Sequence, residues 1–341
     1  MSHVPPASSS GALSETIAEH VVRVPLPLPL PDLETVNAYA ILSSDGVTLI
    51  DPGWAWEPSE TALLAVLSDL GATPSDVRRI LVTHQHWDHY SLGVRWRDEY
   101  GAELMLGREE RHSIKAFASM SGVHPLQAQM LIRAGASALA REVDGIEWEP
   151  YERGVKFTSP DRWLDDGDEI DCGSATITVR ATPGHTRGHV VFDDVAHGAV
   201  FTGDHLLPRI TPSIAFERTP ERLPLRSYLS SLFVFLSLPD SRMLPAHGAA
   251  DRATRGRAAE LLAHHRSRLK LIGDLVAAGA STAFEAASRM RWTRHERALD
   301  DLDVVHRMTA VLEVLSHLEL LVFDKALISA DHNGVDVFTP A

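Results

Sequence analysis

The sequence predicts an α/β protein that ends in a smaller, mostly helical domain. From residue 36 to about residue 249, short apolar segments with strand character alternate with stretches of helical spacing. Several of the strand-like segments run directly into turns that contain histidine. Beyond residue 250 the strand signal nearly vanishes and helical spacing dominates. The 341 residues are enough for about two domains of ordinary size, so we expect two.

The composition excludes several classes of protein. Apolar residues make up 44% of the chain and charged residues 23%, as in ordinary globular proteins. The 32 basic and 46 acidic side chains give a net charge of −14, which disfavours a surface that binds nucleic acid throughout. The single cysteine, Cys172, cannot form an internal disulfide bond. The sequence shows neither a secretory signal nor an apolar run of the roughly 18 residues that span a bilayer. We therefore expect a cytoplasmic protein without membrane contact.

The amino-terminal segment has its own character. Residues 1–20 are rich in Ser and Pro in their first half, and we expect them to be disordered. In Val24–Pro31, proline alternates with leucine. Proline has no backbone N–H to donate to a sheet, so this stretch predicts an edge segment or a polyproline stretch.

The first α/β part follows. Residues 36–42 and 47–50 are strand-like and are separated by a Ser-Asp-Gly turn. Residues 58–70 have helical spacing, with a proline at their start and a glycine after their end. Residues 79–82 form a short apolar strand that leads into Thr83-His-Gln-His-Trp-Asp-His89. Strand ends of this kind are where α/β sheets place their ligand sites.

The chain then changes character twice. Residues 107–155 are helical in propensity and rich in Met and Ala, as expected of a helical insertion. Strand-like segments return in three further places, and a helix is expected near residues 221–236. These strand-like segments are 175–181, 190–192 and 199–201. They lead to the turns that contain Thr182-Pro-Gly-His185 and Thr202-Gly-Asp204.

Helical spacing covers residues 252–278, 282–290 and 300–323, and residues 327–338 read as a hairpin on an Asn-Gly turn. Three helices followed by a β-hairpin is the order of a winged helix. We therefore expect a catalytic domain over residues 21–249 and a winged-helix-like domain over residues 250–341. His264 and His265 fall within the first of these helices, where we expect a solvated face.

The main chemical signal is the motif His84-x-His86-x-Asp88-His89. Imidazole nitrogen and carboxylate oxygen are ligands that Zn²⁺, Mn²⁺ and Fe ions accept. Residues two apart on a loop project to the same side, so His84 and His86 can share one ion. Asp88 and His89 follow two and three residues after His86, where they can reach a neighbouring ion.

Three later turns carry the same kinds of ligand. His185 lies in a Pro-Gly-His-Thr turn, Asp204 in a Thr-Gly-Asp turn and His247 in a Pro-Ala-His-Gly turn. Each turn follows an apolar segment, as it must if several strand ends converge on one pocket. Five histidines and two aspartates are enough for two ions with three or four protein ligands each.

This ordered set of motifs resembles the metallo-β-lactamase superfamily over about residues 21–249. The resemblance implies an αββα sandwich with the metal site at one edge, between the two sheets. It implies one ion on His84, His86 and His185, and a second ion on Asp88, His89 and His247. It further implies that Asp204 bridges the two ions together with a water or hydroxide.

The resemblance also suggests roles for residues beside the ligands. The segment Leu49-Ile-Asp51-Pro-Gly resembles an early aspartate motif of the superfamily, so Asp51 is expected either to hold a ligand histidine or to form a local turn. Asp88 is also the expected proton carrier. His205 directly follows Asp204 and is a second candidate catalytic residue that can donate to substrate; bracing the site is the alternative. His189 is expected to brace its turn.

Two departures from the superfamily pattern affect the interpretation. The residue after the first motif is commonly small, but here it is Tyr90, so the superfamily pattern does not predict what forms the floor of the pocket. Genuine β-lactam hydrolases generally lack an aspartate at the bridging position. Asp204 therefore favours the thioesterase, lactonase, glyoxalase II and nuclease branches over antibiotic hydrolysis.

Three functions follow. The first is a hydrolase that uses two divalent ions, expected to be Zn²⁺ with Mn²⁺ or Fe as alternatives, to open an ester, thioester or lactone bond of a small molecule. The second is an endoribonuclease, because similar domains with a winged-helix tail cleave RNA. The third is a non-catalytic metal-binding protein, and a homodimer is open in each case.

Charge separates the first two functions. Residues 251–297 carry ten basic against five acidic side chains, but the expected groove-entering helix, about 300–320, is acidic. An acidic helix repels phosphate, so we expect a small-molecule substrate rather than nucleic acid.

The helical insertion of residues 107–155 interrupts the strand pattern between the first histidine motif and the Pro-Gly-His turn. We expect it either to cap the core or to act as a lid that selects the substrate. Its apolar residues recur at roughly helical spacing. They are Ile114, Phe117, Ala118, Met120, Leu126, Met130, Leu131 and Ala134.

Overall fold

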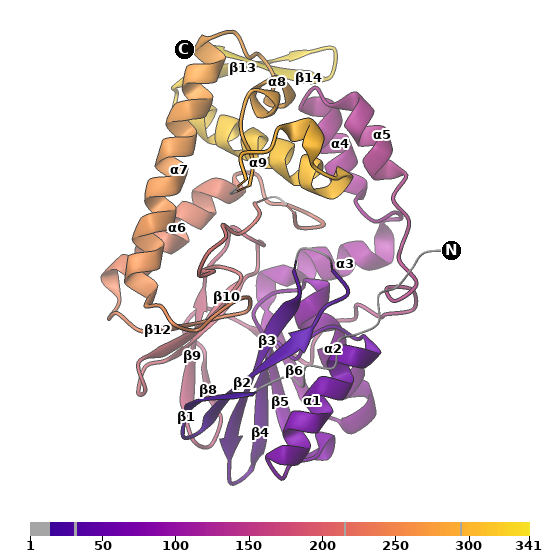
Figure 1. Ribbon diagram of the computed structural model, residues 1–341, viewed down its shortest axis with the longest axis vertical. Helices are drawn as coiled ribbons and strands as arrows, with labels where there is room; N and C mark the ends of the chain where they lie inside the picture. Colours follow the sequence, from indigo (N-terminus) through magenta and orange to yellow (C-terminus); the bar gives the residue numbers. More distant parts are fainter. Residues whose placement is uncertain (1–13, 31–32, 215, 294) are drawn as a thin grey trace.

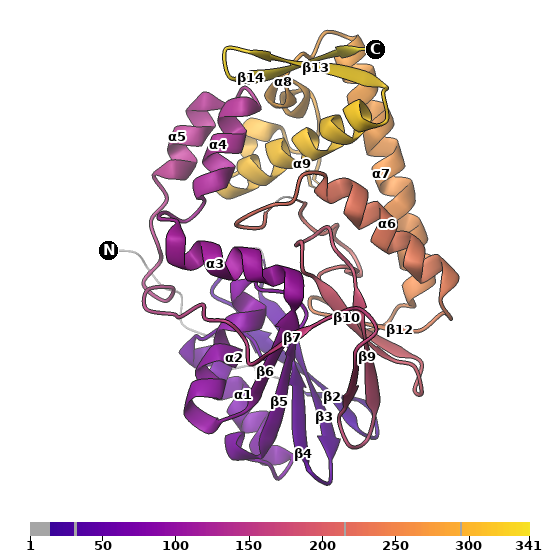
Figure 2. The same ribbon diagram turned by 180° about the vertical axis from the view of Figure 1, so that it is seen from behind.

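The computed structural model describes residues 14–30, 33–214, 216–293 and 295–341. Two β-sheets face each other, helices cover their outer faces, and a further group of helices lies beyond one end of the sheets (Figure 1, Figure 2). The predicted αββα sandwich and the helical carboxyl-terminal part are therefore confirmed. Among the described residues, no helix is long and apolar enough to cross a membrane.

The first sheet has seven strands that follow one another in chain order. Strands β1 to β4 form an antiparallel meander, whereas β4 to β7 are parallel. Helices α1 (Glu57–Asp69) and α2 (Trp87–Tyr100) make the first two parallel crossovers. The strands are β1 (Glu15–Ala18), β2 (Val21–Pro27), β3 (Thr35–Ser43), β4 (Gly46–Ile50), β5 (Val77–Val82), β6 (Glu103–Gly107) and β7 (Arg162–Leu164).

The second sheet has five strands in the order β12-β11-β10-β9-β8. Its pairs are antiparallel except β11 and β12, which are parallel and are joined through helix α6 (Pro224–Ser237). The strands are β8 (Glu169–Asp171), β9 (Thr176–Ala181), β10 (Val190–Asp194), β11 (Ala199–Gly203) and β12 (Arg242–Pro245).

Three apolar clusters hold the four layers together. Between the sheets, residues such as Tyr39 and Leu81 pack against Phe192 and Phe201. Helices α1 and α2 cover the outer face of the first sheet, where Trp96 is fully buried. Helix α6 and the first part of helix α7 (Thr254–Ala277) cover the outer face of the second sheet. Burial on both faces explains why β3, β11 and the first three residues of β10 read as largely apolar runs.

The amino-terminal segment differs from the prediction. Residues 1–13 lie outside the described residues, but Glu15–Ala18 form strand β1 instead of disordered chain. The strand is held by pairing with β2 and by an ion pair of 2.8 Å between Glu15 and Arg23.

The proline-leucine stretch runs through β2, although Pro31 lies outside the described residues. Leu26 is buried, and Pro25 and Pro27 are partly exposed. Both prolines lie beyond the part of β2 that pairs with β1, so on that side no N–H is required of them. The prediction of an edge segment therefore holds only for the second half of β2, which pairs with β3 on one side and has no β1 partner on the other.

The helical part combines segments from two regions of the chain. The insertion forms α3 (Arg111–Ser119), α4 (Pro125–Arg133) and α5 (Ser137–Asp144). The carboxyl-terminal part forms α7, α8 (Ala283–Ser288) and α9 (Val304–Phe323), and then the hairpin of β13 (Leu327–His332) and β14 (Val335–Pro340). This is the expected order of three helices and a hairpin, while a winged-helix identity stays a prediction.

Helices α4 and α5 pack on α9, not on the sandwich, and share one apolar cluster with it. Helix α9 lies at the centre of this helical layer, with ten of its residues buried. His265 of α7 is also buried, 3.2 Å from the ring of His317, which contradicts the solvated face expected there. The reason is that α7 packs against both α6 and α9.

Candidate metal centre

Four turns at one end of the sandwich bring the predicted ligands together. Strand β5 ends at Val82 and leads into the first motif, whose last two ligands lie in the first turn of α2. The other three turns follow β9, β11 and β12. Every predicted ligand is buried or half-buried. The seven are His84, His86, Asp88, His89, His185, Asp204 and His247.

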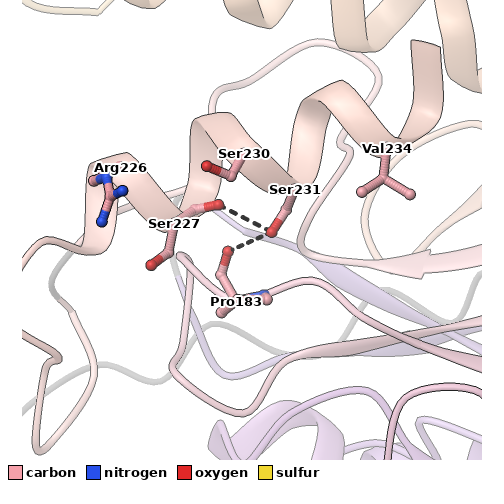
Figure 3. A pocket seen from close by; sticks show the side chains of 6 residues that line it. All are labelled: Pro183, Arg226, Ser227, Ser230, Ser231 and Val234. Carbon is pink, nitrogen blue, oxygen red and sulfur yellow. Dashed lines mark hydrogen bonds between the residues drawn. The ribbon is translucent and has the colours of Figure 1, made fainter. Parts of the chain in front are cut away.

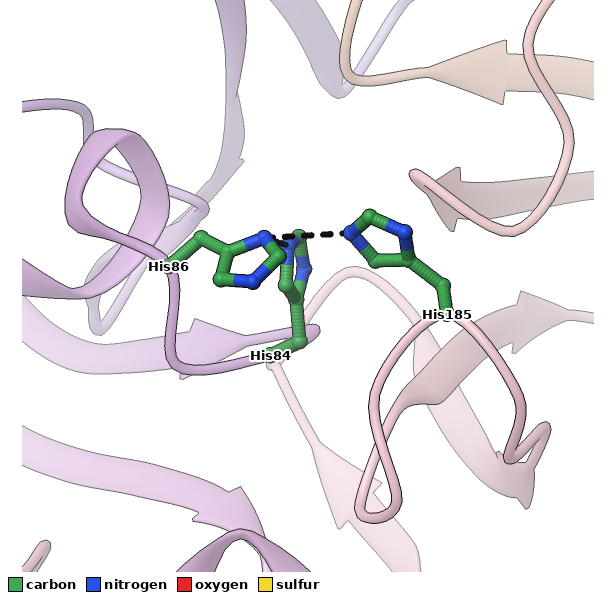
Figure 4. A group of neighbouring side chains, drawn as sticks. All are labelled: His84, His86 and His185. Carbon is green, nitrogen blue, oxygen red and sulfur yellow. Dashed lines mark hydrogen bonds between the residues drawn. The ribbon is translucent and has the colours of Figure 1, made fainter. Parts of the chain in front are cut away.

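Three histidines form the first group of ligands. Nε2 of His84 lies 2.9 Å from Nδ1 of His86, and Nε2 of His185 lies 3.1 Å from the same atom. The three rings converge from two separate turns (Figure 4). These are the residues that the resemblance assigned to one ion.

The hydrogen bond that Nδ1 of His84 makes determines whether its Nε2 carries a proton. Thr83 Oγ1 donates to Asp51 Oδ2 (2.8 Å) and therefore accepts from His84 Nδ1 (3.0 Å). A neutral imidazole carries one N–H, so Nε2 of His84 faces the centre with a lone pair. This is the form of histidine that binds metal ions.

The same argument applies to two further rings. Nδ1 of His185 donates to the backbone carbonyl of Ser213 (2.8 Å). Nδ1 of His247 donates to the backbone carbonyl of Thr35 (2.8 Å). In the neutral form of either ring the lone pair is therefore on Nε2, which faces the site.

The second group forms around Asp88. Its Oδ2 lies 3.4 Å from Nε2 of His247 and 3.6 Å from Nε2 of His89. Nδ1 of His89 lies 3.0 Å from Oδ2 of Asp51. The carboxylate of Asp51 thus anchors His89 directly and His84 through Thr83. This placement supports the expected role of Asp51 in holding ligand histidines.

Asp204 lies between the two groups. Its Oδ1 is 3.3 Å from Nε2 of His247 and 3.7 Å from Nε2 of His89. Its Oδ2 is 3.6 Å from Nε2 of His185. One carboxylate therefore faces ligands of both groups, as a bridging residue must.

Burial and charge act differently on the two groups. Burial lowers the pKa of His84 and His86 well below its usual value, and the neighbouring histidines lower it further. Burial also opposes the charged form of His89, but the carboxylates of Asp88 and Asp51 raise its pKa to about 10. The first group is therefore a set of neutral donors, and the second combines imidazoles with carboxylates.

This donor set fits divalent transition-metal ions. One Nδ1 proton on His86 cannot satisfy the lone pairs of both His84 and His185, whereas a cation satisfies all three nitrogens. Nε2 of His89 and His247 and Oδ1 of Asp204 are buried without a hydrogen-bond partner among the described residues. Imidazole and carboxylate ligands in this mixture suit Zn²⁺, Mn²⁺ or Fe.

The turn that carries His185 is fixed against α6. Ser231 Oγ donates to the carbonyl of Pro183 (2.9 Å), beside a shallow hollow on the outer side of this turn (Figure 3). A Cβ atom on Gly184, whose φ is +137°, would lie 2.4 Å from the backbone of Tyr228. Only glycine permits this approach, so α6 sets the position of His185. The hollow itself is lined by none of the predicted ligands.

His205, the second candidate catalytic residue, lies behind the ligands. Its buried ring packs 4.9 Å from the ring of Tyr228 and 5.5 Å from that of Phe235, both in α6. Burial lowers the pKa of His205 to about 3, so the ring is neutral. A catalytic role for it stays a prediction. His189 bonds Thr182 Oγ1 through Nδ1 (2.9 Å), as expected of a bracing residue.

The residue after the first motif, Tyr90, lies away from the ligands. Its ring is fully buried and its hydroxyl donates to the carbonyl of Thr158 (2.6 Å). Tyr90 belongs to the apolar cluster of the first sheet and α2. Its size is accommodated in that layer, where its ring lies 5.9 Å from that of Phe157.

Sequence reasoning missed two buried glutamates next to the ligand turns. Glu110 accepts a hydrogen bond from Thr186 Oγ1, and Glu217 accepts from Ser113 Oγ and from the backbone N–H of Arg187 (2.8 Å each). Each bond joins residues far apart in the chain, so no local motif reveals it. The carbonyls of Ser213 and Thr35 were missed because backbone acceptors have no residue signature.

Sequence reasoning also missed Phe216, whose ring centroid lies 5.7 Å from that of His86. On its other side stands His124, at 5.5 Å. Phe216 also packs against the apolar cluster of the helical layer. Phe216 thus links the helical layer to the first ligand group.

Comparison with known proteins gives the family context. The sequence profile of the metallo-beta-lactamase superfamily matches residues 31–247. An uncharacterised protein of Mycobacterium leprae (strain TN) is 30% identical over 225 residues, which are 62% of this chain and 86% of that protein. A probable metallo-hydrolase of Bacillus subtilis (strain 168) is 23% identical and covers 90% of this chain and 93% of its own length.

One further relative and one solved structure add to this context. A hydroxyacylglutathione hydrolase of Chelativorans sp. (strain BNC1) is 26% identical over 49% of this chain and 48% of its own. The crystal structure of a metallo-beta-lactamase family protein from Thermus thermophilus superposes with a TM-score of 0.75. It is 26% identical and covers 96% of this chain and all of that one, so the similarity includes the helical layer.

Proposed function

The chain belongs to the metallo-β-lactamase superfamily and is a metal-dependent hydrolase, and on that premise we propose that it opens the ester, thioester or lactone bond of a small molecule with two divalent ions. His84, His86 and His185 would hold one ion, and Asp88, His89 and His247 the other. Zn²⁺ suits these ligands, with Mn²⁺ or Fe as alternatives.

The position of Asp204 carries the proposal. Its two oxygens face nitrogens of both groups at 3.3 to 3.7 Å, which suits a carboxylate shared by two ions. When bound, paired ions polarise an acyl carbonyl and bring the pKa of water towards 7, which supplies both electrophile and nucleophile.

The protein's own residues supply orientation and proton transfer. Asp51 fixes the rings of His84 and His89, so the ligand atoms are in place before substrate arrives. Asp88 is 12% exposed through its side chain, and its carboxylate would accept a proton and return it to the leaving oxygen or sulfur. The apolar ring of Phe216 lies against His86 and would restrict water on that side.

The surroundings of His86 support an apolar acyl group. Phe216 lies against its ring, and His124 lies against Phe216. Burial lowers the pKa of His124 to about 4, so that side chain is neutral. Trp87, the residue after His86, packs among Phe117, Phe157 and other aromatic rings. The relative that is a hydroxyacylglutathione hydrolase adds support for a thioester.

The packing of α9 disfavours the endoribonuclease alternative. The helix expected to enter a nucleic-acid groove is enclosed by α4, α5, α6, α7 and α8. Of its two glutamates, Glu313 is buried enough that its pKa is raised. A helix enclosed in this way cannot present base-reading side chains without unfolding the layer around it.

The test is a substrate panel combined with metal analysis. We expect metal-loaded protein to hydrolyse at least one class among acyl-CoA thioesters, glutathione thioesters and lactones, and to leave structured RNA intact. Asp204→Ala should bind less metal than wild type treated in the same way and lower turnover by about 10²-fold or more, as removal of a charge-stabilising group does. His112→Ala, an exposed position outside the site, should change neither.

Two outcomes would overturn the proposal. One is RNA cleavage that disappears in His84→Ala while thioesters and lactones stay intact. The other is a full metal load with unchanged turnover in Asp204→Ala, which would remove the bridging role.

A further inference from the structure

Three more metal-type side chains meet at the end of the sandwich opposite the candidate centre. His20 lies in the turn between β1 and β2. Asp194 is the last residue of β10, and His197 lies in the turn that leads to β11. Strands β10 and β11 have their other ends at the ligand turns of the catalytic site, so their connecting turn lies at the far end of the sheet.

The imidazoles of His20 and His197 both contact the carboxylate of Asp194. Nδ1 of His197 lies 2.8 Å from Oδ1 and 2.9 Å from Oδ2 of Asp194. Nε2 of His20 lies 3.2 Å from Oδ2. The two rings lie against each other, with centroids 4.1 Å apart and planes tilted by 45°. Two nitrogens and a carboxylate thus converge on one point from chain segments that belong to different sheets.

Burial gives this group a closed inner side and an open outer side. The side chain of Asp194 is 1% exposed, that of His20 11% and that of His197 41%. A buried carboxylate needs a positive partner. The exposed flank beside His197 leaves room for water to complete a coordination shell.

The spacing matches that of the candidate catalytic ligands. The first catalytic group places its donor atoms 2.9 and 3.1 Å apart, and this group places its donors 2.8 to 3.2 Å apart. Two imidazoles and one carboxylate are a ligand set that Zn²⁺ and its neighbours accept, with solvent in the remaining position.

We propose that His20, Asp194 and His197 form a further divalent-metal site, separate from the catalytic centre. An ion there ties the β1–β2 turn of the first sheet to the β10–β11 turn of the second. The β1–β2 hairpin is the outer edge of its sheet, so the ion fixes an edge that is otherwise held mainly by its pairing with β3.

The experiment is zinc binding to full-length protein and to matched variants. Metal is removed, the protein is reloaded with excess Zn²⁺ and desalted, and bound zinc is measured by elemental analysis. We expect His197→Ala and Asp194→Asn each to bind one equivalent less than wild type. His332→Ala, an exposed histidine of β13, should match wild type. The difference between variants does not depend on how many ions the catalytic centre holds.

Two further measurements separate this site from the catalytic one. His197→Ala should keep wild-type turnover, and zinc should raise its melting temperature less than that of wild type. Anomalous diffraction at the zinc edge from wild-type crystals should show a peak between the three side chains. Equal zinc content in wild type and His197→Ala, or an anomalous map without that peak, would show that the three residues form only a His–Asp–His ion-pair cluster.

Discussion

Among single residues, Asp51 connects most of the candidate metal centre. It is 2% exposed, accepts from the backbone N–H and the hydroxyl of Thr83 at 2.8 Å each, and pairs with His89. Its φ of +49° lies in the left-handed region, which non-glycine residues seldom adopt. This backbone conformation costs free energy, and the contacts that the carboxylate makes with Thr83 and His89 offset that cost.

We expect Asp51→Asn to weaken metal binding by about 10- to 100-fold, as loss of a ligand's outer partner typically does. Oδ1 of Asp51 accepts from the backbone N–H of Thr83, and Oδ2 faces both the Thr83 hydroxyl and His89. The NH2 group of an asparagine would face a donor at either of these positions, so at least one of the contacts is lost. Competition with a chromophoric chelator measures the change. Asp144→Asn, on the exposed end of α5, is the control, and equal affinity in both variants would refute the positioning role of Asp51.

The buried Glu217 predicts a dependence of stability on pH. Burial raises its pKa to about 7, against the opposing hydrogen bonds from Ser113 and Arg187. The folded protein therefore binds this proton more tightly than the unfolded chain does. The resulting stabilisation is present below the unfolded pKa near 4.5 and is lost as the pH rises through about 7.

We expect Glu217→Gln, which keeps the shape and cannot ionise, to gain stability relative to wild type between pH 5 and pH 8. Denaturant unfolding at both pH values measures this difference. Glu103→Gln, at an exposed position of β6, should show no such change. An unchanged difference between wild type and Glu217→Gln at the two pH values would mean that Glu217 is ionised throughout.

Among the elements, the helices of the insertion of residues 107–155 pack against two different parts of the molecule. Phe117 of α3 stacks on Phe157, at 4.0 Å between ring centroids, and also contacts Trp87. Met130 of α4 instead packs into the apolar cluster around α9. The predicted lid is therefore better assigned to Phe216, which touches His86, than to Met130.

The two side chains should separate specificity from stability. We expect Phe216→Ala to raise KM for bulky acyl substrates more than for short ones, with metal content unchanged. Met130→Ala should leave the ratio of KM values unchanged and lower stability by about 1–2 kcal/mol, less than a fully buried methionine would. Steady-state kinetics over a series of acyl lengths and thermal melts measure both. If Phe216→Ala changed KM equally for all lengths, its ring would only support the fold.

For the whole molecule, the sequence predicted what local signals encode. Strand ends that run into His84, His185, Asp204 and His247 revealed the ligand set, because each ligand follows an apolar strand directly. Contacts between distant segments have no such signal. The bond from Glu217 to Ser113 spans 104 residues, and the packing of α4 on α9 joins the insertion to the carboxyl-terminal helices. Periodicity identifies an apolar face, but it does not say which partner covers that face.

The expected domain boundary at residues 249 and 250 illustrates the point. It falls between β12 and α7, where the sequence changes from mixed to helical. In the structure, Ala258 and Leu261 of α7 pack with Val191 and Met243 on the outer face of the second sheet. The same helix continues into the helical layer, where Ile272 and Val276 are buried. One helix therefore belongs to both cores.

Shared packing of this kind predicts that the two parts unfold together. A chain that ends at residue 249 would expose the outer face of the second sheet and the faces of α4 and α5 that contact α9. We expect it to lose its cooperative thermal transition and to bind a hydrophobic dye.

A chain that ends at residue 325 loses only the terminal hairpin, whose first strand is exposed except at Leu327, and should still melt cooperatively at a lower temperature. Circular dichroism melts of the three chains decide between the alternatives. A cooperative transition of the shorter chain near that of the intact protein would mean that the sandwich folds alone and that α7 is only an addition to it.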